Sequence, residues 1–119
     1  MRTPATKLEN ASLNARLKTL LGDLRRRFQE LYGDRLVTLV LYGSQARGDA
    51  GPGSDIDLLV VLRGPVQLGT EVERTGGIIS ELSLQFDEVL SCVFVDEEQF
   101  LRRNTPLLLN VRKEGVEVA

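Results

Sequence analysis

The stretch from Leu41 to Leu62, LYGSQARGDAGPGSDIDLLVVL, constrains the fold of this chain more than any other. An apolar run, Leu36–Tyr42, ends in Gly43–Ser44, and a second apolar run follows directly after Asp55–Ile56–Asp57. Two glycines and a proline mark residues 49–54 between the runs as a loop. The pattern predicts two neighbouring strands joined by a short turn and a loop, with polar residues at the end of one strand and the start of the next.

The two aspartates point to a metal site. Side chains alternate along a strand, so Asp55 and Asp57 should share one face while Ile56 points to the other. Two strand rises put their Cα atoms roughly 6.6 Å apart, a spacing from which carboxylates can converge on one hard cation or bridge two. A partly buried carboxylate such as Asp57 costs several kcal/mol unless it is paired or metal-bound. We therefore predict that Asp55 and Asp57 ligate Mg²⁺ or Mn²⁺.

Gly43 and Ser44 are predicted to bind phosphate. A glycine lets a phosphate approach the backbone closely, and Ser44 can cap a following turn whose free N–H groups bind anions. The expected ligand is the triphosphate of ATP or another NTP, facing the carboxylate pair. Arg47, three residues past Ser44, has two open interpretations: a phosphate contact or a salt bridge to a loop acid such as Asp49.

Together these residues resemble the nucleotidyltransferase signature of the DNA polymerase beta superfamily, in which Gly-Ser ends one strand and Asp-x-Asp opens the next. The form GSQARG…SDIDLLV is most similar to the minimal nucleotidyltransferases (MNT), which are often paired with a HEPN-domain partner. The likeness is strongest over Leu39–Leu62. It implies an α/β (α+β) fold with a small mixed sheet of three to four strands and helices packed on it.

The resemblance also implies an activity, which is transfer of an NMP, most simply AMP from ATP, to an acceptor hydroxyl. Some MNT proteins are antitoxins that adenylylate a HEPN toxin, so a protein acceptor is expected, together with a homo- or hetero-oligomer. The alternative is a catalytically degenerate MNT module that neutralises or scaffolds a HEPN partner by contact alone. The family often uses a third carboxylate on the next strand, but the matching position falls near Val89 to Ser91, where no acid stands; Asp87 and Glu88 lie just upstream. Glu88, or less readily Asp87, is the candidate general base.

Composition narrows the chemistry further. The 119 residues contain no histidine, which removes Ser-His and Cys-His pairs and leaves carboxylates, hydroxyls, Lys and Arg for catalysis. A net charge of −2 gives no basic field for nucleic acid. Without an apolar segment long enough for a membrane or a signal peptide, and with a single cysteine, the chain is expected to be cytoplasmic. We expect one domain over residues 1–119, with 1–10 frayed.

Outside the motif, periodic apolar residues predict a helix from Asn10 or Ser12 to Gly33. A second helix should start at Gly69 or, if the glycine pair breaks it, at Gly76. A strand is expected over Glu88–Val95, followed by two short helices and a terminal edge strand at Val116–Val118. Two further runs, one basic and one apolar, each have two possible interpretations. Arg25–Arg27 is a solvated face or a contact for RNA or a partner, and Leu107–Leu109 is core helix or an interface.

Overall fold

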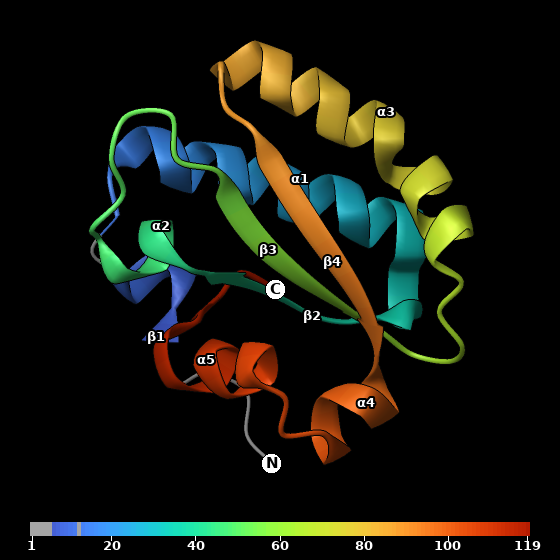
Figure 1. Ribbon diagram of the computed structural model, residues 1–119. Helices are drawn as coiled ribbons and strands as arrows, with labels where there is room; N and C mark the ends of the chain where they lie inside the picture. Colours follow the sequence, from blue (N-terminus) through green and yellow to red (C-terminus); the bar gives the residue numbers. More distant parts are fainter. Residues whose placement is uncertain (1–5, 12) are drawn as a thin grey trace.

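The computed structural model describes residues 6–11 and 13–119, which form a mixed five-stranded sheet with helices on both faces (Figure 1). The strands are β1 (Thr6–Lys7), β2 (Leu36–Tyr42), β3 (Ile56–Leu62), β4 (Leu90–Asp96) and β5 (Val116–Glu117), in the order β1-β5-β2-β3-β4. The helices are α1 (Ala15–Tyr32), α2 (Ser44–Arg47), α3 (Leu68–Phe86), α4 (Glu97–Arg102) and α5 (Pro106–Glu114), with 3-10 turns η1 (Leu8–Asn10) and η2 (Gly33–Arg35). The predicted fold class is confirmed.

The sheet has one strand more than the upper expectation because residues before α1 also pair. β1 runs parallel to β5, and β5 runs antiparallel to β2, so β5 is an inner strand and not the edge strand that we predicted. The expected fraying of residues 1–10 is wrong for residues 6–10, whereas residues 1–5 lie outside the described part. Leu8 is buried in the core, and Lys7 pairs with Glu117 at 2.6 Å, which ties this segment to the last strand.

The long helices differ from the predictions at their boundaries. α1 begins after Asn14, whose Oδ1 accepts a hydrogen bond from the Leu17 amide at 2.8 Å. The expected start at Asn10 is therefore too early, and Ser12 lies outside the described residues. α3 begins at Leu68 and continues through Gly76–Gly77 without a break. Tertiary packing of its apolar face outweighs the low helix propensity of the two glycines.

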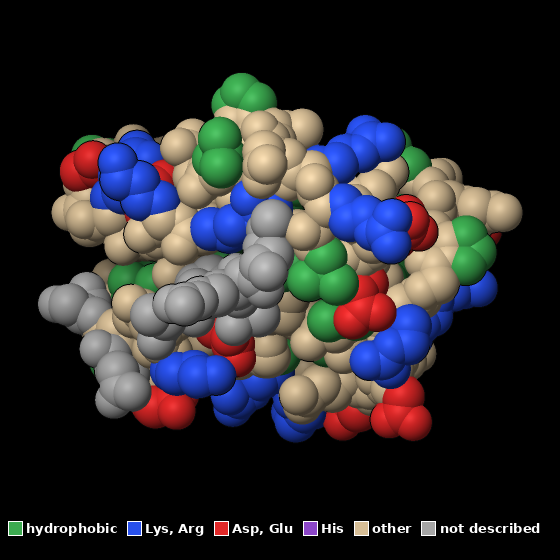
Figure 2. All heavy atoms as spheres, turned by 90° about the horizontal axis from the view of Figure 1, so that it is seen from below, with side chains coloured by type: hydrophobic (Ala, Val, Ile, Leu, Met, Phe, Trp, Pro, Cys, Tyr) green, Lys and Arg blue, Asp and Glu red, His purple; other side chains and the backbone are tan. Residues whose placement is uncertain are grey.

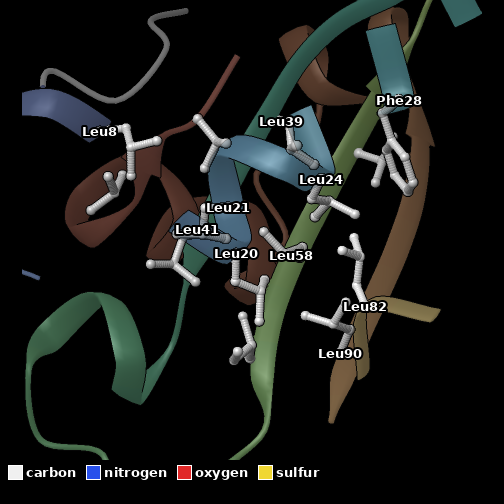
Figure 3. Packing of buried hydrophobic residues seen from close by; sticks show 14 of the residues in the cluster. Leu8, Leu20, Leu21, Leu24, Phe28, Leu39, Leu41, Leu58, Leu82 and Leu90 are labelled. Carbon is white, nitrogen blue, oxygen red and sulfur yellow. The ribbon is translucent and has the colours of Figure 1, made fainter. Parts of the chain in front are cut away.

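Two apolar layers explain why the central strands are continuously hydrophobic. Alternate residues of β3 face opposite sides: Leu58 and Val60 join the cluster under α1 and α3, and Leu59 and Val61 join the cluster under α4 and α5. Figure 3 shows the first cluster, in which leucines of α1 interlock with leucines of β2, β3 and β4. A strand covered on both faces leaves polar residues room only at its ends, which is where the motif lies.

The two open sequence runs also have places in the fold. Arg26 pairs with Asp23 and Glu30, and Arg27 with Glu81, so this run carries surface ion pairs. The run Leu107–Leu109 lies in α5, where Leu108 is buried and Leu109 is half exposed, so this segment is mainly core helix. Figure 2 looks onto the side that carries α4 and α5, where basic and acidic side chains are interspersed. Within the described residues, no helix is long and apolar enough to cross a membrane.

Candidate functional site

The two halves of the motif meet at one end of the β2–β3 pair. The antiparallel register sets Tyr42 opposite Asp57, so Gly43 leaves β2 beside that carboxylate. Gly43 has φ 77° and ψ −158°, a conformation that is essentially confined to glycine. A Cβ at this position would lie 2.6 Å from Oδ2 of Asp57. The Gly43 backbone therefore lies directly against the Asp57 carboxylate, and a side chain at position 43 would overlap with that carboxylate.

Ser44 is the first residue of α2, the single helical turn that follows. The Arg47 amide donates to the Gly43 carbonyl at 3.0 Å, and Gly48 ends the turn in the left-handed conformation. The first N–H groups of a helical turn have no partner within it, so those at Ser44 and the residues after it can receive an anion. Gln45 donates from Nε2 to the Ser54 carbonyl at 3.4 Å, which links the turn to the loop before Asp55.

The two aspartates differ in their surroundings. Asp55 is exposed just before β3, whereas Asp57 is half-buried within it. Burial raises the pKa of Asp57, the nearby charge of Asp55 raises it further, and Arg47 lowers it. Burial also raises the pKa of Tyr42, to which the charge of Asp57 adds, so a neutral hydroxyl flanks the carboxylate. Sequence reasoning overlooked Tyr42, because its place opposite Asp57 depends on the register between β2 and β3.

This donor set fits a hard cation. Asp55 and Asp57 repel each other when both are ionised, and a divalent ion between them would neutralise both charges. In the described part of the chain, no three His, Cys, Asp or Glu side chains come together as a metal-binding group. The site therefore offers a carboxylate pair, Asp55 and Asp57, as the residues that could hold Mg²⁺ or Mn²⁺.

Arg47 lies beside the pair and is held by acids. Its Nε is 3.1 Å from Asp49 Oδ2, which is the loop contact that the sequence suggested as one alternative. Its Nη1 is 3.0 Å from Glu114 at the end of α5, a contact between distant segments that the sequence pattern could not indicate. Both acids raise the pKa of Arg47, so its guanidinium stays charged. That charge lowers the pKa of Asp57. A phosphate would compete with Asp49 and Glu114 for this guanidinium.

Glu88 precedes β4 and opens onto the α1 side of the sheet, where Ile56 and Gln45 line the same small cavity. Asn14, Arg16 and Phe86 also line this cavity, whereas Asp57 faces the layer of α4 and α5. The residue across from Asp57 on β4 is Ser91, which shares its face. The structure thus brings together Gly43, Ser44, Arg47, Asp55 and Asp57, and it places Glu88 in a cavity on the α1 side, the opposite face from Asp57.

Comparison with known proteins identifies the class to which this fold and site belong. Residues 21–114 match the family described as nucleotidyltransferase domain. The protein MJ0604 of Methanocaldococcus jannaschii, which carries the name "putative protein adenylyltransferase", is 33% identical over 85 residues, covering 71% of this chain and 79% of that protein. MJ0141, with the same name and organism, is 27% identical over 83% of this chain and 95% of its own length. The chain belongs to the nucleotidyltransferase domain family.

A third relative and the solved structures extend the likeness. MJ1305 of the same organism, with the same name, is 38% identical over 47 residues, and the match spans only 32% of its length. A toxin-antitoxin crystal structure with AMP-PNP has a similar fold, with a TM-score of 0.60 at 18% identity over 82% of this chain and 72% of that one. A Shewanella oneidensis MNT antitoxin complex with its tri-AMPylated HEPN toxin gives 0.50 at 17% identity over 85% and 71%. At these identities the likeness to the MNT structures is one of fold, and the resemblance to nucleotidyltransferases drawn from the sequence is confirmed by the family match.

Proposed function

We propose that this protein transfers AMP from ATP to a hydroxyl group of a partner protein, in a reaction that depends on Mg²⁺ or Mn²⁺. The observation that carries the proposal is the meeting of Gly43 with Asp57, which puts an anion-binding turn against a carboxylate that gains from a cation. The names of the relatives and the HEPN complex of the structural neighbour support a protein acceptor of the HEPN class.

Each residue has a part in this reaction. The amides at Ser44 and the following residues hold the triphosphate, and Arg47 exchanges its ion pairs with Asp49 and Glu114 for a phosphate contact. Asp55 and Asp57 would orient the nucleotide by holding a divalent cation, which would neutralise charge on the phosphates. The acceptor oxygen bonds to the α-phosphorus in line, the bond to the bridging oxygen breaks, and pyrophosphate leaves. The acceptor proton passes to solvent.

The test is transfer from ATP labelled at the α-phosphate to a candidate HEPN partner. We expect label on the partner with Mg²⁺ and none after chelation or with Asp57→Asn. Asp87→Asn is the matched control, since it removes the same charge from an exposed residue at the end of α3. Equal labelling by wild type and Asp57→Asn, or labelling that survives chelation, would refute the proposal.

A second candidate function rests on Ser91. A serine in the position across from Asp57, where the family often has an acid, favours a module that neutralises its partner by binding alone. The two functions separate in one experiment: the binding module should neutralise the partner equally well with Asp57→Asn, whereas the transferase should not.

A further inference from the structure

Three side chains lie in a row across the sheet at the candidate site. β2 and β3 pair antiparallel with Tyr42 opposite Asp57, and β3 and β4 pair parallel with Asp57 opposite Ser91. Cross-strand partners share a face, and neighbouring strands lie about 4.8 Å apart. The side chain of Ser91 therefore stands directly beside the Asp57 carboxylate, on the flank away from Gly43, and is half-buried.

Other acids near this end of the sheet do not fill the flank of Ser91. Glu88 lines a cavity on the α1 side, and Asp87 is exposed at the end of α3. Asp49 and Glu114 are held by Arg47. In keeping with this, the described residues contain no group of three metal-ligating side chains.

We propose that Ser91 limits this chain to holding one divalent cation by itself, so that a second cation binds at this site only weakly, through oxygens of the nucleotide and the acceptor. This inference rests on the proposed function and deepens it. A hydroxyl is a neutral oxygen donor and cannot offset the charge of a second ion as a carboxylate does, so two carboxylates support one ion firmly. The position that would anchor a second ion is occupied by Ser91.

The inference predicts a gain of binding in Ser91→Asp. This substitution adds a third carboxylate on the same face and next to Asp57, without changing the strand register. In the metal-free state, like charges should repel and lower the melting temperature, and Mn²⁺ should reverse the loss. Ser91→Asn is the matched control, because it has nearly the same shape without the charge, and Ser91→Ala tests the hydroxyl itself.

The experiment is a titration of the full chain with Mn²⁺, followed by electron paramagnetic resonance, in the presence of a non-hydrolysable ATP analogue. We expect one tightly bound Mn²⁺ per chain in wild type, Ser91→Ala and Ser91→Asn. Ser91→Asp should bind a second Mn²⁺ at least tenfold more tightly than wild type does. Melting curves with and without Mn²⁺ give an independent readout of the same ion.

The outcomes separate the inference from the proposed function. Two Mn²⁺ ions of similar affinity in wild type, or a folded Ser91→Asp variant that gains none, would overturn the inference and leave the transferase proposal intact. If Ser91→Asp fails to fold, the wild-type stoichiometry decides alone. Absence of any Mn²⁺-dependent nucleotide binding in wild type would instead overturn the proposed function.

Discussion

The close contact between Gly43 and Asp57 makes Gly43→Ala the sharpest test of the site. Two effects can be separated. The backbone at Gly43, with φ 77° and ψ −158°, is strained for any residue with a Cβ, and such strain costs about 1–3 kcal/mol of folding free energy. For a chain of this size, about 2 kcal/mol lowers Tm by roughly 6–12 °C.

The second effect acts on the ligand. The new Cβ would lie 2.6 Å from Oδ2 of Asp57, so the carboxylate must rotate until the separation reaches an ordinary 3.4 Å or more. Rotation of a side-chain end costs little stability, but it misplaces a predicted metal ligand. Changes that misorient ligands typically weaken metal binding by about 10–100-fold. We therefore expect Gly43→Ala to bind Mn²⁺ with the ATP analogue at least tenfold more weakly than wild type.

Gly64→Ala is the matched control. Gly64 also has a positive φ, of 82°, but a Cβ there would meet no atom within 4 Å, and the residue lies in the connection after β3. Calorimetry with the Mn²⁺ complex of the analogue and thermal melting should show a loss of stability in both variants and a loss of affinity in Gly43→Ala alone. Affinity within twofold of wild type in Gly43→Ala would refute the placement of Asp57 at the ligand.

Three further predictions follow from buried and charged groups. Asp57→Asn should abolish transfer yet melt at the same or a higher temperature at pH 7. Folding raises the pKa of Asp57, so the ionised carboxylate destabilises the folded protein once the pH rises above the ordinary pKa of 3.8, and the variant removes this cost. A clear drop in Tm would contradict this. Glu88→Gln should keep turnover within a few-fold of wild type in the labelled transfer assay, since Glu88 lies on the α1 side; a loss of about 10² or more would make it the general base after all. Tyr32→Phe should destabilise the fold by about 1.5–3 kcal/mol in denaturant melts, because the Tyr32 hydroxyl donates to the buried Glu71 carboxylate at 2.9 Å; an unchanged midpoint would show that this bond contributes nothing.

The parts of the site that could be predicted from the sequence are those set by short-range geometry. Alternation along one strand put Asp55 and Asp57 on one face, and the break after Tyr42 placed Gly43 and Ser44 at a turn. The N-caps of α4 and α5 are set by equally local contacts, since Asp96 accepts from the Gln99 amide at 2.7 Å and Thr105 from the Leu108 amide at 3.3 Å. In each case the interacting groups are only a few residues apart.

What could not be predicted depends on register between distant segments. Ser91 is the neighbour of Asp57 only because β4 pairs with β3 in one register, and a shift of a single residue would turn Ser91 to the other face. The Arg47–Glu114 pair joins two turns that are far apart in the chain. β1 has only two residues, too few for a periodic signal, and it is recognisable only once β5 is in place.

The two ends of the sheet differ in how a buried or half-buried carboxylate is compensated by its neighbours. At the end of β3 away from the motif, Glu71 is almost fully buried, and it accepts from Tyr32 and pairs with Arg35 at 3.3 Å. A buried carboxylate with such partners is satisfied within the chain and serves the fold. Asp57 is only half-buried, yet its nearest acidic neighbour, Asp55, opposes its ionisation, and Arg47 is shared with two other acids.

The cost of Asp57 is therefore not offset within the described chain in the way that the cost of Glu71 is. Replacing it with an apolar residue would suit the strand better, since Leu58 and the residues after it are fully buried and apolar. Asp57 keeps its charge at a cost in stability, and the Gly43 backbone leaves room beside it. We attribute this arrangement to a positively charged ligand from outside the chain. The contrast between Glu71 and Asp57 therefore supports our proposal that Asp57 holds a divalent cation.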